Sequence, residues 1–159
     1  MKAFLPEQTR ISQVHLRTAK LEGAVAFYTD VLGLKLLHAP GSHAILSATG
    51  ERPVLLDLTE DLNAPLRPPG STGLYHFAIR YPRREDLAHA YYRLVRSDYP
   101  VAGASDHGVS EALYLRDPDG NGVELYWDRP KEQWPRTPDG GIDMFTYPLD
   151  LKALLKEAA

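Results

Sequence analysis

The chain has 159 residues, of which 43% are hydrophobic and 25% are charged, and its formal net charge is -3. These values suit one folded domain of ordinary size and exclude a disordered chain, and the slight negative charge excludes a basic surface for nucleic acid. The sequence contains no cysteine, which excludes disulfides and zinc–thiolate sites and leaves histidine and carboxylate side chains as the ligands for any metal.

Residues 1–10 are mostly polar and contain Pro6, so we expect a loose arm or an edge extension. They lack the apolar core of roughly 7–15 residues that a signal peptide has. No run of the chain approaches the ~20 apolar residues of a membrane helix. From these features we expect a cytoplasmic protein that does not bind membranes.

The first unit of the chain has the pattern strand, helix, strand, strand, strand. Residues 11–17 alternate between polar and apolar types, which predicts a strand. Thr18 is the expected N-cap of an amphipathic helix that ends at Gly33. Three more strands are expected at 34–38, 43–48 and 53–58.

A hydrophilic, proline-rich connection occupies about 61–72, and the same order of elements then follows. A strand is expected at 74–81, and a second helix is marked by Leu87, Tyr91, Leu94 and Val95. Further strands are expected at 101–105, 111–116 and 123–127. The C-terminal extension contains a short helix with Asp150 as its expected cap.

A repeat of this length predicts a fold class. His15 opens the first unit and is followed by Tyr28, and His76 opens the second unit and is followed by Tyr91. We expect an α+β fold in which two paired βαβββ modules form a curved mixed sheet around a metal-binding cleft. The chain, 1–159, is then one domain: module one at about 11–60, a linker at 61–72, module two at about 73–130, and an extension at 131–159.

Three side chains of metal-ligand type lie on predicted strands, opposite an apolar face. His15, His76 and Glu124 each alternate with apolar neighbours, so all three are expected on the cleft side. Two histidines and one carboxylate leave coordination positions open, which suits Fe(II) or another divalent ion. Each residue alone is more often structural, but together with the repeat they predict one metal site.

A resemblance to the vicinal oxygen chelate superfamily is carried by HLRTAKLEGAVAFYTDVLGLKLL, by DPDGNGVELYWDRP and by the spacing of the three ligand residues. This group contains glyoxalase I, fosfomycin resistance thiol transferases, bleomycin-binding proteins and extradiol dioxygenases. The segments most similar to the catechol 2,3-dioxygenase type are GLYHFAIRYPRREDLAHAYYRL and GASDHGVSEALYLRDPDGNGVELYWDRP. The resemblance covers about 10–155 and implies that His15, His76 and Glu124 are the metal ligands.

The resemblance also implies catalytic residues for extradiol cleavage, in which a catechol and O₂ meet at one metal ion. It places a catalytic tyrosine at Tyr114 and a histidine of the site's edge at His107. Their alternative interpretations are a strand aromatic and a loop histidine.

One histidine that the resemblance implies is missing from this sequence. The family's additional acid/base histidine has no counterpart between Thr59 and Tyr75. His43 and His38 could replace it only if the sheet folds them inward, which we do not expect.

Glyoxalase I uses four protein ligands, and the fourth would fall on the last strand of module one. The residues that align there with Glu124 are Val54 or Leu55, neither of which can bind a metal, and Asp57 is out of register. The resemblance therefore favours an extradiol dioxygenase with one divalent ion, Fe(II) before Mn, Zn or Ni. Glyoxalase-like isomerase or lyase, thiol transferase, and a non-catalytic binding protein of the bleomycin-resistance type remain alternatives.

The expected partner is a small-molecule substrate. Two-domain catechol dioxygenases continue with another pair of modules after a segment like PLDLKALLKEA, whereas this sequence stops there. We therefore expect a single domain that works alone as a homodimer, and the alternative is a relative that only binds metal. The three ligands can meet within one chain or across the dimer, and the sequence leaves both arrangements open.

Overall fold

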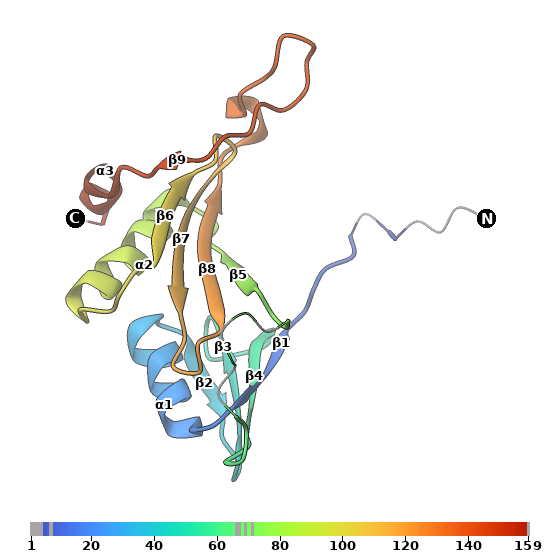
Figure 1. Ribbon diagram of the computed structural model, residues 1–159, viewed down its shortest axis with the longest axis vertical. Helices are drawn as coiled ribbons and strands as arrows, with labels where there is room; N and C mark the ends of the chain where they lie inside the picture. Colours follow the sequence, from blue (N-terminus) through green and yellow to red (C-terminus); the bar gives the residue numbers. More distant parts are fainter. Residues whose placement is uncertain (1–4, 7, 66–67, 69, 71, 159) are drawn as a thin grey trace.

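The computed structural model describes residues 5–158 apart from 7, 66–67, 69 and 71, and it divides the strands between two sheets (Figure 1). The strand order is β1-β4-β3-β2 in the first sheet and β5-β8-β7-β6-β9 in the second. In each sheet the first strand pairs in parallel with the last strand of its module, and the remaining pairs are antiparallel. This repeated order confirms the α+β fold of paired βαβββ modules. The assignment of 1–159 to one domain stays a prediction.

The first sheet is formed by β1 (Val14–Thr18), β2 (Lys35–His38), β3 (His43–Ser47) and β4 (Val54–Glu60), with helix α1 (Leu21–Ala26) and the wider turn η1 (Phe27–Val31) after β1. Strand β1 begins later than expected, because its ladder starts where Val14 meets Leu56. Thr18 is the last residue of β1, and Lys20 takes the N-cap position, so the predicted Thr18 cap is wrong.

The second sheet and its surroundings contain β5 (His76–Arg80), α2 (Arg84–Arg96), β6 (Gly103–Asp106), β7 (Ser110–Arg116), β8 (Gly122–Asp128), η2 (Lys131–Gln133), β9 (Tyr147–Pro148) and α3 (Leu151–Lys156). Helix α2 buries Leu87 and Leu94, whereas Val95 is 50% exposed. Asp150 caps α3 as expected, because its carboxylate accepts from the Ala153 N–H at 2.9 Å. The short strand β9, which pairs with β6, was not expected.

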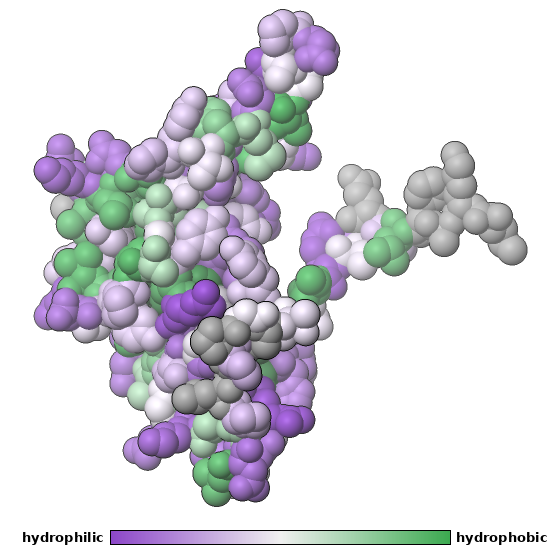
Figure 2. Space-filling model, viewed as in Figure 1, coloured by the Kyte–Doolittle hydropathy of each residue, from purple (hydrophilic) through white to green (hydrophobic). Residues whose placement is uncertain are grey.

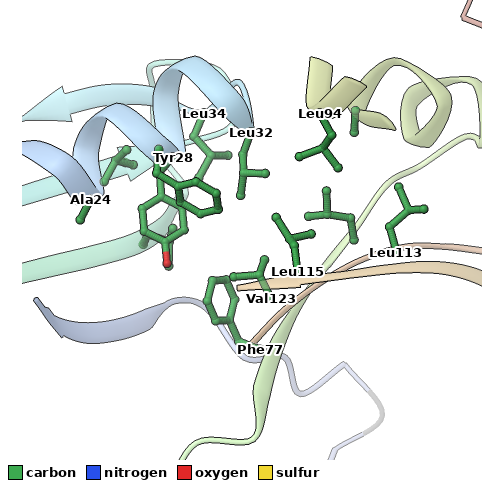
Figure 3. Close-up of a cluster of buried hydrophobic side chains, with 14 of the residues drawn as sticks. Ala24, Tyr28, Leu32, Leu34, Phe77, Leu94, Leu113, Leu115 and Val123 are labelled. Carbon is green, nitrogen blue, oxygen red and sulfur yellow. The ribbon is translucent and has the colours of Figure 1, made fainter. Parts of the chain in front are cut away.

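Side chains from both modules form one hydrophobic core. Tyr28 and Leu32, from the first helical segment, lie near Phe77, Leu115 and Val123 of the second sheet (Figure 3). Both α1 and α2 lie on the same side of the sheets (Figure 1). The opposite side carries the half-buried residues of each strand, and the candidate site lies there.

Polar contacts also join the two modules. The buried Tyr28 hydroxyl donates to Asp117 at 2.7 Å, and the Ala19 N–H donates to Asp119 at 3.0 Å. Arg93 of α2 donates to the carbonyl oxygen of Leu32 at 2.9 Å. Burial, followed by the Asp117 carboxylate, raises the pKa of the Tyr28 phenol, which keeps it a donor. These contacts fix one module against the other.

Two segments project from the body: an N-terminal arm and a loop of the C-terminal extension (Figures 1 and 2). The arm exposes Leu5 and Ile11, and the extension exposes Ile142, Met144 and Tyr147. The predicted linker at 61–72 includes 66–67, 69 and 71, which lie outside the described residues. Within the described ranges, no helix is long and apolar enough to cross a membrane.

Candidate functional site

His76 and Glu124 meet on the open face of the second sheet. They lie on the neighbouring strands β5 and β8, and His76 Nε2 is 3.0 Å from Glu124 Oε2. Their side chains are 33% and 15% exposed. The strand alternation explains this placement, because Phe77 and Val123 fill the helix-covered side and turn their neighbours to the open side.

Tyr114 extends this pair. It lies directly opposite Glu124 in the β7–β8 ladder, and its hydroxyl donates to Glu124 Oε1 at 3.2 Å. Burial, followed by the charge of Glu124, raises the pKa of Tyr114 to about 12. The phenol is therefore protonated at neutral pH and can act as a hydrogen-bond donor.

His107 lies at the far end of this chain of contacts. Its Nε2 is 3.0 Å from the Tyr114 hydroxyl, and its Nδ1 is 3.1 Å from the carbonyl oxygen of Phe145. Because a carbonyl oxygen only accepts, Nδ1 carries a proton. The Tyr114 hydroxyl thus lies within hydrogen-bond distance of both Glu124 Oε1 and His107 Nε2. The predicted residues Tyr114 and His107 thus lie together, and their catalytic roles stay predictions.

The C-terminal extension fixes His107 in a way that the sequence did not reveal. A Cβ added at Gly108 would lie 2.8 Å from the Phe145 ring and 2.9 Å from Pro135, so the extension packs directly on this glycine. Gly108 also has φ +76°, which glycine adopts without strain. The sequence contains no local pattern that predicts the Gly108–Phe145 contact, because the two residues lie far apart in the chain.

A second polar cluster lies on the open face of module one. His15 Nε2 is 2.9 Å from the Thr59 hydroxyl and 3.7 Å from Asp57 Oδ1. His43 Nε2 makes a short hydrogen bond with the same Asp57 oxygen. His43 thus lies on the open face of module one, because residues 43, 57 and 59 lie on adjacent strands with their side chains on one face.

The strand register also corrects the position equivalent to Glu124. His76 pairs with Gly122, and Glu124 is two residues farther along β8. In module one, His15 pairs with Asp57, so the equivalent position is Thr59. Val54 and Leu55, the residues expected there, are wrong. A hydroxyl replaces the carboxylate at this position.

The three predicted metal ligands do not all meet within one chain. Among the described residues, no three His, Asp or Glu side chains gather closely enough to hold a metal ion. His76 borders a groove of about 840 Å³ next to the N-terminal arm, whereas His15 and Thr59 border a different hollow of about 270 Å³. The structure therefore brings Glu124 to His76 and leaves His15 with Asp57 and Thr59.

The donor chemistry of the His76–Glu124 pair fits a divalent ion. An imidazole nitrogen and a carboxylate oxygen are ligands that iron and its neighbours in the first transition series accept. Tyr114 holds the second oxygen of Glu124, as outer partners of metal ligands commonly do. This pair supplies two of the three expected ligands, and the identity of the metal and of the third ligand stays a proposal.

Comparisons with known proteins identify relatives of the chain. Residues 10–125 match the profile of the Glyoxalase/Bleomycin resistance protein/Dioxygenase superfamily. The chain is 45% identical over 153 residues to a catechol-2,3-dioxygenase of Bacillus subtilis (strain 168), covering 96% of this chain and 53% of that protein. It is 33% identical to biphenyl-2,3-diol 1,2-dioxygenase 3 of Rhodococcus globerulus, covering 75% of this chain and 63% of the relative. The chain thus spans roughly half to two-thirds of these proteins.

Solved structures show the same fold. A lactoylglutathione lyase from Agrobacterium tumefaciens aligns with a TM-score of 0.57 and 26% identity, covering 77% of this chain and 96% of that one. A glyoxalase/dioxygenase from Nostoc punctiforme aligns with a TM-score of 0.65 and 19% identity, covering 82% and 99%. At that identity, the second likeness concerns the fold alone.

Proposed function

Because the chain belongs to the Glyoxalase/Bleomycin resistance protein/Dioxygenase superfamily, we propose that it is an extradiol dioxygenase that opens the ring of a catechol-type substrate. The observation that carries the proposal is the continuous chain of contacts from His76 through Glu124 and Tyr114 to His107. It combines two ligand-type side chains with a protonated phenol. The similarity to a catechol-2,3-dioxygenase supports the same chemistry.

In the proposed reaction, the ring bond beside one hydroxyl breaks and both atoms of O₂ remain in the product, so no external reductant is needed. A bound divalent ion, Fe(II) in our proposal, would supply a Lewis acid for the two neighbouring substrate oxygens. Tyr114 donates a hydrogen bond to the oxygen on which negative charge develops. His107 holds the Tyr114 hydroxyl in position, and Phe145 holds His107.

We assign three ligands: His76 and Glu124 of one chain and His15 of a second copy. Within one chain, the Tyr28–Asp117 bond and the shared core hold the modules in an arrangement in which His15 and His76 border different hollows. Among the described residues, β1 and β5 are the terminal strands of their sheets, and an unpaired strand edge can pair with another chain. A homodimer can therefore complete the site without disturbing the packing of either chain.

The activity is tested by anaerobic loading of the protein with Fe(II), followed by oxygen uptake with a panel of catechols. We expect oxygen consumption together with the absorbance of a ring-opened product. Tight binding of an aromatic compound without oxygen uptake would instead indicate a binding protein. Turnover of a hemithioacetal would indicate glyoxalase chemistry, which the hydroxyl of Thr59 at the fourth-ligand position does not favour.

The shared site is tested by mixing two inactive variants, His15→Ala and His76→Ala. If each site combines module one of one chain with module two of the other, a mixed dimer has one intact site and one doubly altered site. Free subunit exchange between equal amounts should restore roughly a quarter of wild-type activity. If each site lies within one chain, mixing restores nothing, and the dimer assignment is wrong. Co-purification of differently tagged chains confirms that the subunits exchange.

A further inference from the structure

Module one carries a histidine–carboxylate pair that the function above does not use. His43 Nε2 bonds to Asp57 Oδ1, and the two side chains are 34% and 20% exposed. The same Asp57 oxygen lies 3.7 Å from His15 Nε2. Any arrangement that brings His15 to the metal therefore also brings this pair to the site.

The pair has a defined place in the repeat. His43 lies opposite Thr59 in the β3–β4 ladder, just as Tyr114 lies opposite Glu124 in the β7–β8 ladder. His43 of one module thus occupies the position that Tyr114 occupies in the other. An imidazole and a phenol would then approach the cleft from equivalent positions.

Asp57 has no counterpart in module two. The equivalent residue is Gly122, where an added Cβ would lie 2.3 Å from the Tyr75 carbonyl oxygen and 2.8 Å from His76 Cβ. Backbone so close leaves no room for a side chain there. A carboxylate at this position is therefore found in module one alone.

Asp57 also determines which nitrogen of His43 is available. A carboxylate accepts the Nε2 proton, so the neutral imidazole keeps its lone pair on Nδ1. No hydrogen bond from the described residues reaches this Nδ1, whereas both ring nitrogens of His107 are engaged. With a third of its side chain exposed, His43 can exchange a proton with a bound molecule.

We propose that His43, oriented by Asp57, is the acid/base residue of ring cleavage. This assignment rests on the proposed function. His43 takes the proton of one catechol hydroxyl as the substrate binds, and it returns the proton to an oxygen of the ring-opened product. The proton balance of the cycle is zero, and His43 is neutral again at its end. Asp57 is a positioning residue that acts through His43.

The pH behaviour of His43 depends on its charged neighbours. The other titratable side chains on this face or at its margin are Asp57 on β4, His15 and Arg17 on β1, Asp61 just after β4, and His38 on β2. Of these, Asp57 is the only one that the structure shows in contact with His43. Arg17 is paired with Asp61 at 3.3 Å. The profile of a His43 variant must therefore be compared with a matched variant on the same face.

The test compares His43→Gln with wild type and with His38→Gln, an exposed histidine on the neighbouring strand. Iron content and anaerobic catechol affinity should stay within about twofold in both variants, since neither residue is assigned as a ligand. In His43→Gln, kcat should fall roughly 100- to 1,000-fold, as for loss of a general base, and the acid limb of the kcat/KM profile should disappear. His38→Gln should retain wild-type kcat and pH profile.

Two further variants keep the test decisive if His43→Gln folds poorly. Added imidazole should restore part of the turnover of His43→Ala, which a purely structural role would not allow. Asp57→Asn should shift the acid limb and lower kcat by about tenfold, since orientation of the imidazole is weakened.

Three results would overturn the assignment. Wild-type kcat and pH profile in His43→Gln or Asp57→Asn would show that the imidazole has no proton-transfer role. Loss of iron from His43→Gln at equal folding would make His43 a ligand. If wild-type protein consumes no oxygen with any catechol, the proposed function fails first, and this assignment falls with it.

Discussion

The two modules present equivalent faces with different chemistry. His15 and His76 lie on equivalent strands. Opposite strand positions nevertheless hold Glu124 and Tyr114 in module two, but Thr59 and His43 in module one. One face pairs a carboxylate with a phenol, and the other holds two imidazoles around one carboxylate. A repeated backbone therefore does not imply repeated chemistry, and a complete site needs both faces. The four predictions below test this difference.

The largest expected effect is on iron affinity, which should depend much more on Glu124 than on its counterpart Thr59. Replacing Glu124 by Ala removes a ligand of the proposed site, so iron affinity should fall by more than the roughly 10- to 100-fold that loss of an outer partner costs. Thr59→Ala removes only a hydroxyl that contacts His15, and its loss of affinity should stay within that range. Anaerobic iron titration measures both. Equal retention of iron by the Glu124→Ala protein would contradict the ligand assignment.

Replacing Tyr114 should lower turnover and affect metal binding less than replacing Glu124 does. Tyr114→Phe keeps the ring and removes the donor, so kcat should fall roughly 100-fold, as for loss of one stabilising hydrogen bond to a developing charge. Iron affinity should fall by no more than the roughly 10- to 100-fold that loss of an outer partner costs. Steady-state oxygen uptake gives kcat and KM separately. A change confined to KM would instead mean that the phenol only binds substrate.

The repeat also contains two tyrosines with different roles. Tyr28 is fully buried and bonded to Asp117, whereas no hydrogen bond of the Tyr91 hydroxyl is found among the described residues. Tyr28→Phe leaves Asp117 with one partner fewer and should lower the free energy of unfolding by about 1–3 kcal/mol. Tyr91→Phe should change it by less than about 0.5 kcal/mol. Urea unfolding of the two variants provides the comparison.

The same tyrosine should give a component of alkaline instability. The folded pKa of Tyr28 lies above that of the unfolded chain, so its contribution is complete below the unfolded pKa near 10 and declines as the pH rises further. Between pH 10 and 11 the wild-type free energy of unfolding should decrease more steeply than that of Tyr28→Phe, by at most ~1.4 kcal/mol per pH unit. Parallel curves would show that Tyr28 ionises in the folded protein as it does in the unfolded one.

Local pattern was enough for much of this structure. The alternation around His15, His76 and Glu124 placed each on the open side of a strand, and the repeat predicted the order of the elements in each module. Asp150 was recognised as a helix cap from its position alone. These features depend on period and on neighbours in the chain, which the sequence contains directly.

Tertiary structure decided which side chains meet. The β1–β4 ladder pairs His15 with Asp57, so pairing puts Thr59 at the position for which counting along the chain suggested Val54 or Leu55. His43 joins Asp57, and Phe145 joins His107, through contacts between strands and an extension that no local period encodes. Sequence alone determined the elements and the ligand types. Strand pairing and the shared core determined their partners, because a shift of one residue in register turns every side chain of a strand to the other face.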